Sequence, residues 1–169
     1  MEPIVNRIAQ SGLVTIDLAD YFPSPDEIAI LDIKDYLFQG LILREKDYRQ
    51  ALEQQDWRAF QNRYAGITCS ADAIIPLWAY MLPVKHLQGV AREIYPGDFD
   101  SVRLQVALDR IRALPVENFQ GQRVLVKGCG DEQIPSSLYL AITQKLLPHV
   151  KSLMYGEACS HIPIYKQKG

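Results

Sequence analysis

The sequence lacks the features that would tie the protein to a membrane or to nucleic acid. No window approaches the roughly 20 consecutive apolar residues that a transmembrane helix needs. The first residues, MEPIVNRI, have no long apolar core, so they do not resemble a secretory signal. The net charge is only -2, which gives no electrostatic attraction to nucleic acid or to an anionic membrane. We therefore expect a cytoplasmic protein with no nucleic acid and no membrane among its partners.

Linkers and nucleotide-binding motifs are also absent. Residues 127–131 follow an expected strand and precede an expected helix, as a phosphate-binding loop does. Their glycines have neither the Walker spacing nor the dinucleotide-binding spacing, so we expect no nucleotide cofactor. No Gly/Ser-rich or Pro-rich stretch divides the chain. Its 169 residues, 48% of them hydrophobic, fit a single domain, 1–169, with a sizeable core.

Cysteine is scarce, but the cysteines share a pattern. There are three of them, and an odd number in a reducing compartment argues against a disulfide framework. Each is followed by an Ile-Pro pair: Cys69 by Ile75-Pro76, Cys129 by Ile134-Pro135 and Cys159 by Ile162-Pro163. The first two copies also carry a tyrosine four residues after the proline, Tyr80 and Tyr139, and another 26 residues after the cysteine, Tyr95 and Tyr155. The sequence therefore predicts one unit that occurs twice.

Each copy has the pattern of a strand, a helix and a second strand. The short apolar runs at 64–68 and 123–127 are typical of buried strands. In the first copy we expect a helix at 77–90, after the Ile-Pro pair, and a strand at 92–95. In the second copy we expect the helix at 136–150 and the strand at 152–155. A right-handed crossover makes the two strands of each copy parallel.

The remaining sequence supplies further strands and helices. Alternation predicts strands at 13–18 and 28–31, and helical spacing predicts one or two helices within 32–55 and another at 100–113. The sum is an α/β fold, a three-layer sandwich with a largely parallel sheet built from two related βαβ units. Along the chain we expect N-terminal strands and helices packed on the sheet at 1–60, the first βαβ unit at 61–97, a linking helix and turn at 98–121, and the second unit with a C-terminal tail at 122–169.

The cysteines are expected to meet at one edge of this sheet. Cys69 and Cys129 follow the carboxyl ends of their strands, where open α/β sheets place their sites, and Cys159 follows the strand that closes the second unit. Thiolates suit zinc and iron–sulfur clusters, and one further group would complete a tetrahedral site. The predicted metal ligands are Cys69, Cys129, Cys159 and one of His161 and Glu157, with Asp72 and Asp131 as carboxylate alternatives.

Two other interpretations of the cysteines stay open. Lys127 or Lys166 beside a cysteine would lower the pKa of its thiol and make it a nucleophile, which predicts a thiol enzyme. Buried free cysteines also commonly serve as small apolar core residues, which predicts a binding or scaffold protein with inert thiols.

Five stretches of the sequence resemble the bacterial domain-of-unknown-function family 2480. They are IVNRIAQSGL at 4–13, LFQGLILREKD at 37–47, ITCSADAIIP at 67–76, VKGC at 126–129 and SLMYGEACS at 152–160. The resemblance covers nearly the whole chain and implies that Cys69, Cys129 and Cys159 match cysteine positions of the family. At the position of His161 the family pattern more often has threonine. The resemblance assigns no activity, but it implies an association with iron–sulfur cluster assembly components.

The cysteine pattern and the resemblance together predict a metal-binding or iron–sulfur-related protein, an accessory factor in cluster assembly or metal handling. Its expected cofactor is zinc or an iron–sulfur cluster, and its expected partners are iron–sulfur assembly proteins. An exposed edge strand would also allow two copies to pair as a symmetric homodimer.

Overall fold

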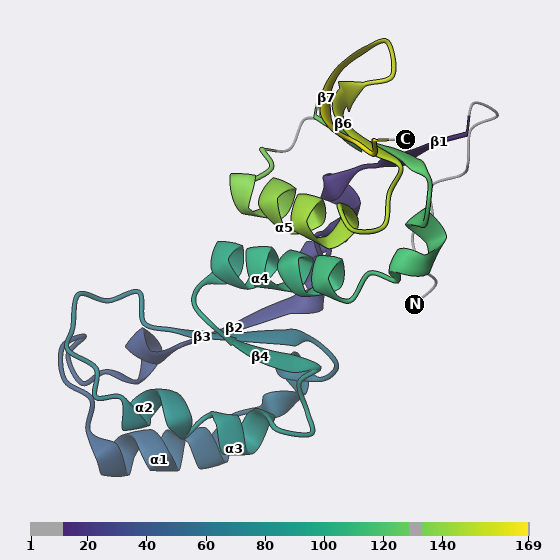
Figure 1. The fold of residues 1–169 in the computed structure, drawn as a ribbon. Coiled ribbons are helices and arrows are strands. Elements are labelled where there is room, and N and C mark those ends of the chain that lie inside the picture. The colour runs from purple at the N-terminus through teal and green to yellow at the C-terminus, as the bar shows by residue number, and fades with distance from the viewer. Residues whose placement is uncertain (1–11, 129–132, 169) are drawn as a thin grey trace. The chain divides into compact units, whose positions relative to one another are not determined.

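The structure, a computed structural model, describes residues 12–128 and 133–168 (Figure 1). It confirms the α/β class, the largely parallel strands and the two related βαβ units. The chain divides into two compact units: unit 1 comprises Met1–Phe22 and Ala107–Gly169, and unit 2 comprises Pro23–Val106. Each unit has its own sheet. None of the helices in the described part of the chain has the length and apolar content to span a membrane.

Unit 2 contains a sheet of three parallel strands in the order β2-β3-β4. The strands are β2 (Ile28–Asp32), β3 (Tyr64–Thr68) and β4 (Glu93–Pro96). Helix α1 (Glu45–Gln54) connects the first two strands, and the short helices α2 (Trp78–Met81) and α3 (Val84–Leu87) connect the last two. The crossover from β3 to β4 is the first βαβ unit that the sequence predicted, and the crossover from β2 through α1 to β3 is a further one that it did not predict.

The sheet of unit 2 is covered on both faces. One face packs against α1, α2 and α3 through fully buried side chains that include Leu52 and Leu87. The other face packs against Val102 and Val106 of helix α4 (Phe99–Arg112). Gly66 of β3 makes this second contact close, because an added Cβ there would lie 2.7 Å from Val102 Cγ2. Burial of each large apolar side chain stabilises the fold by about 1.5–3 kcal/mol.

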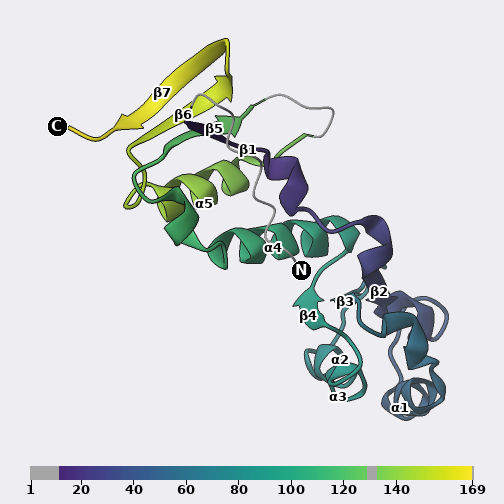
Figure 2. The ribbon, with the colours of Figure 1, turned by 90° about the vertical axis from the view of Figure 1, so that its right-hand side faces the viewer.

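Unit 1 contains a sheet of four strands in the order β1-β5-β6-β7. Strands β1 (Leu13–Ile16), β5 (Arg123–Lys127) and β6 (Ser152–Glu157) are parallel, and β7 (Ser160–Lys166) is antiparallel to β6. Helix α5 (Ser136–Leu146) connects β5 to β6 and lies along one face of the sheet (Figure 2). Its buried residues recur at helical spacing, Leu138, Ile142 and Leu146.

Prolines explain where the helices differ from the prediction. The helix expected at 77–90 is two short helices, because Pro83 has no N–H for an intrahelical hydrogen bond and α3 starts after it. The helix expected at 136–150 ends at Leu146, two residues before Pro148. Within 32–55 only α1 is an α-helix, and it is preceded by the 3-10 turn Ile33–Tyr36.

The two units repeat one plan with a constant spacing of 59 residues, the interval between Asn62 and Gly121. These two residues both have a left-handed backbone, with φ of 59° and 69°. The amide of Asn62 donates to the carbonyl of Val90 at 2.9 Å, and the amide of Gly121 donates to the carbonyl of His149 at 2.8 Å. The same spacing relates the 3-10 turns Trp57–Phe60 and Val116–Phe119, strands β3 and β5, Pro76 and Pro135, strands β4 and β6, and the positive-φ glycines Gly97 and Gly156.

Each unit also begins in the same way. An aspartate ends or follows the first strand, Asp32 in unit 2 and Asp17 in unit 1, and accepts a hydrogen bond of 3.0 Å from the amide two residues later. A 3-10 turn follows in both units, within the repeated sequence Asp-Leu/Ile-x-Asp-Tyr. Unit 2 is therefore a second copy of the plan that interrupts unit 1 between Phe22 and Ala107, within α4.

The shared spacing corrects the alignment of the cysteines. By sheet register and by the 59-residue spacing, Thr68 of unit 2 corresponds to Lys127 of unit 1. The counterpart of Cys69 is therefore Gly128. Tyr95 corresponds to Met154 by the same register, so its match to Tyr155 was wrong by one residue. One extra residue between the strand and the cysteine produced the apparent match. The alignment of Tyr80 with Tyr139 agrees with the spacing.

Candidate functional site

The carboxyl edge of the unit 1 sheet carries a cluster of charged side chains. Asp17 follows β1, Lys127 ends β5, and Lys127 Nζ donates to Asp17 Oδ2 at 3.1 Å. This hydrogen bond and the charge of Asp17 raise the pKa of Lys127, and the more distant charges of Glu157 and Asp20 act in the same direction. The lysine is therefore held as a cation among three carboxylates, at the edge where α/β sheets usually place their sites.

Asp20 differs from the other carboxylates of this edge. Burial raises its pKa, the negative charge of Asp17 raises it further, and the charge of Lys127 partly opposes both. The Asp20 carboxyl therefore has a pKa above that of an ordinary aspartate.

The backbone after Lys127 passes close to Tyr155 of β6. A Cβ added at Gly128 would lie 2.5 Å from Tyr155 Cζ, so any larger residue there requires the Tyr155 ring to shift. The Tyr155 hydroxyl donates to the Gly128 carbonyl over 3.5 Å. Cys129 and Asp131, which the sequence predicted as ligands or alternatives, lie outside the described residues.

Three other predicted residues lie on or beside the β6–β7 hairpin. Cys159 is exposed in the turn between the strands. Glu157 pairs with Ser160, and His161 pairs with Gly156 in the next rung. Adjacent rungs of a regular ladder face opposite sides of the hairpin, so Glu157 and His161 do not share a face.

Gly156 makes this tight hairpin possible. Its φ is 123°, and a Cβ there would meet the Ser160 carbonyl oxygen at 2.6 Å. Only glycine combines this backbone conformation with so close an approach. The turn that presents Cys159 therefore depends on a residue three positions earlier.

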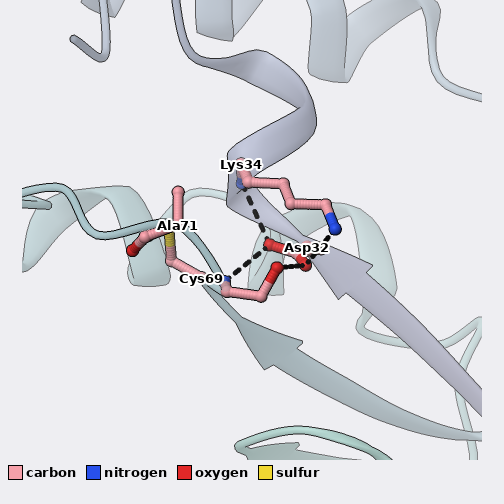
Figure 3. Close-up of polar contacts among 5 residues, drawn as sticks. Asp32, Lys34, Cys69 and Ala71 are labelled. Atoms are coloured by element: carbon pink, nitrogen blue, oxygen red, sulfur yellow. Dashed lines mark hydrogen bonds and ion pairs between the residues drawn. The ribbon is translucent and has the colours of Figure 1, made fainter. Parts of the chain in front are cut away.

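Cys69 lies at the corresponding edge of unit 2 (Figure 3). It follows β3, is half-buried, and packs against the apolar cluster of that unit. Its Sγ lies 3.9 Å from the carbonyl oxygen of Ala71. These surroundings are typical of a small packing residue, which is one of the interpretations that the sequence left open.

The carboxylate of Asp32, near Cys69, accepts several hydrogen bonds. Its carboxylate accepts from the Ser70 amide at 3.0 Å and from the Ser70 hydroxyl at 2.6 Å. The Lys34 amide donates to it at 3.0 Å, and Lys34 Nζ lies 3.6 Å away. Burial by itself would raise the pKa of Asp32, but the hydrogen bonds from Ser70 and Lys34 outweigh it and lower the pKa.

The structure thus brings some of the predicted ligands together. Glu157, Cys159 and His161 share one hairpin of unit 1, whereas Cys69 belongs to unit 2. Among the residues described, no group of three or more His, Cys, Asp or Glu side chains is arranged to hold a metal ion. Asp17, Asp20 and Asp32 were not among the predicted residues, although the repeated Asp-Leu/Ile-x-Asp-Tyr motif is visible in the sequence.

Comparison with known proteins gives a family but no activity. No curated protein and no solved structure matches the chain. A family model described as a protein of unknown function, DUF2480, matches residues 2–167. That match spans nearly the whole chain and bears out the resemblance found in the sequence. The chain therefore belongs to the DUF2480 family.

Proposed function

We propose that the protein binds a soft metal ion or an iron–sulfur species through its cysteine thiolates, as an accessory factor in cluster assembly or metal handling. The observation that carries the proposal is the hairpin that holds Glu157, Cys159 and His161 at the carboxyl edge of the unit 1 sheet. Cys129 follows the neighbouring strand β5 in the sequence and is the second thiolate of the proposed site.

The donor chemistry of the hairpin fits such a group. Cys159 is exposed and sulfur is a soft ligand, while imidazole and carboxylate both bind zinc. Because Glu157 and His161 face opposite sides of the hairpin, one of them at most serves as a ligand beside Cys159. Lys127 adds a positive charge to the same edge, where it pairs with Asp17.

Elemental analysis of the whole chain, purified without oxygen, tests the proposal. We expect about one equivalent of metal, lost in Cys129→Ser and Cys159→Ser. Ser160→Ala changes a neighbouring exposed residue that is not a proposed ligand, so it serves as the control and should keep the metal. Less than a few tenths of an equivalent in the wild-type protein, or no change in a triple Cys→Ser variant, would rule the proposal out.

A second candidate is a thiol enzyme that uses one cysteine as its nucleophile. The exposure of Cys159 favours it, since a nucleophile has to reach its substrate. This candidate predicts that one cysteine is alkylated much faster than the others near pH 7, with or without a chelator. A metal site instead predicts protection of every ligand cysteine until a chelator is added.

Pairing with iron–sulfur assembly proteins, homodimer formation and a cytoplasmic location stay predictions.

A further inference from the structure

Unit 1 contains a cavity of about 320 Å³ beside helix α5. Tyr139 and Thr143, one helical turn apart on α5, form one wall. The strands supply the rest of the lining, with Val126 of β5, Leu153, Met154 and Tyr155 of β6, and Ile164 of β7. All of these residues belong to the same unit and are described by the structure.

The lining residues that the structure describes are apolar or uncharged. Its polar groups are the hydroxyls of Thr143, Tyr139 and Tyr155. The rings of Tyr139 and Tyr155 meet edge to face, with centroids 5.6 Å apart and planes at 73°. Ligand cavities commonly combine such an apolar lining with a few polar groups that fix orientation, and they start near 300 Å³.

The lining of this cavity differs from the corresponding positions of unit 2. By the shared spacing, Thr143 replaces Val84 and Tyr155 replaces Pro96. Ile164 has no counterpart, because the sheet of unit 2 ends at β4. The two hydroxyls and the β7 wall are therefore additions of unit 1 to the shared plan.

We propose that this cavity binds a small uncharged molecule of about two fused rings that carries a hydroxyl or a comparable hydrogen-bonding group. A cavity of about 150 Å³ holds benzene, so twice that volume has room for about two rings. The absence of charge in the lining selects a neutral molecule, because burial of an unpaired charge is costly. The tyrosine rings offer edge and face contacts to a flat ring, and the Thr143 hydroxyl offers a hydrogen bond. The proposal does not depend on the cysteines.

Binding of 2-naphthol, a neutral two-ring alcohol, tests the proposal on the whole chain by titration calorimetry and by NMR shifts. We expect saturable binding that shifts the resonances of Thr143 and Ile164. Thr143→Phe fills the cavity and should weaken binding by at least about tenfold, by the steric cost of overpacking. Ile164→Ala removes one wall and should weaken it several-fold; because Ile164 is 52% exposed, this variant is expected to fold.

Leu140 supplies the matched control. It lies on the outer face of the same helix and is 71% exposed. Leu140→Ala should leave binding unchanged, whereas non-specific adhesion to exposed apolar surface would fall with it. No binding by the wild-type protein, equal binding by the Thr143→Phe and Ile164→Ala variants, or loss of binding in Leu140→Ala would each overturn the proposal. Metal content should be the same in all three variants, so this result is separate from the outcome for the thiolate site.

Discussion

Asn62 and Gly121 occupy the same place in the two units, each with a left-handed backbone and an amide that donates to a carbonyl in the turn after the following helix. Asparagine tolerates this conformation better than most residues, and glycine adopts it freely. The pair shows that the repeated plan constrains the backbone more strongly than the side chain.

We expect Gly121→Val to destabilise the protein by about 1–2 kcal/mol, the cost of placing an L side chain in the left-handed region. An added Cβ at Gly121 would meet no atom within 4 Å, so this cost reflects the backbone and not a clash. Gly121→Asn should cost clearly less, because Asn62 holds the equivalent position. Urea unfolding of both variants measures the difference. Equal losses would contradict the proposed equivalence.

Ser70→Ala should destabilise the protein by about 1 kcal/mol at pH 7, since it removes the 2.6 Å hydrogen bond to the Asp32 carboxylate. Asp32 has a folded-state pKa below its ordinary value. Its stabilising contribution is therefore complete above the unfolded pKa, about 3.9, and is lost as the pH falls through the folded pKa. Unfolding measured at pH 7 and near pH 3 should show the difference between wild type and variant shrinking in acid. Ser70→Thr keeps the hydroxyl and should remain close to wild type.

Gly128→Ala should destabilise the protein by about 1–3 kcal/mol, the usual cost of overpacking. The new methyl group would lie 2.5–2.7 Å from atoms of the Tyr155 ring. A smaller side chain at position 155 would remove this clash, so Tyr155→Leu should recover much of the loss in a double-mutant cycle. Additive effects of the two substitutions would show that the strain has another source.

Alkylation should distinguish Cys159 from Cys69. In protein treated with a chelator, iodoacetamide should modify exposed Cys159 faster than half-buried Cys69, which packs against the apolar cluster of unit 2. Peptide mass spectrometry over a time course gives both rates. Faster modification of Cys69 would contradict its role as a packing residue.

Substitution of the same two cysteines should affect stability differently. Cys69→Ser places a hydroxyl against apolar neighbours and should lower the free energy of unfolding by about 1–2 kcal/mol. Cys159 lies in an exposed turn, so Cys159→Ser should change the free energy of unfolding by less than about 0.5 kcal/mol. Urea unfolding of metal-free protein makes the comparison.

The regular elements of the fold were largely predictable from local pattern. Strands β3 and β5 begin and end at the predicted residues, because short buried runs of apolar residues give a clear signal. Strand β7 was assigned to a tail, since most of its residues are exposed and Pro163 interrupts its pattern. The division into two sheets was not predicted either, because strand order depends on pairing between distant segments.

The site was harder to predict for the same reason. The position of Cys69 after a strand follows from neighbouring sequence and was predicted. The pairing of Asp17 with Lys127 joins residues 110 positions apart and depends on the register of β1 with β5. The repeated Asp-Leu/Ile-x-Asp-Tyr motif would have indicated the strand ends, but not the lysine that meets the first of them.

The interruption of unit 1 by unit 2 has a consequence for synthesis on the ribosome. Strand β1 ends at Ile16, but its partner β5 begins at Arg123. All of Pro23–Val106 is translated in between, and domains generally fold as they emerge. We therefore expect unit 2 to fold first. Strand β1 stays unpaired until β5 has been synthesised, and pairing between such distant segments is slow. A nascent chain whose first 106 residues have left the ribosome would carry a complete second unit and an incomplete first one.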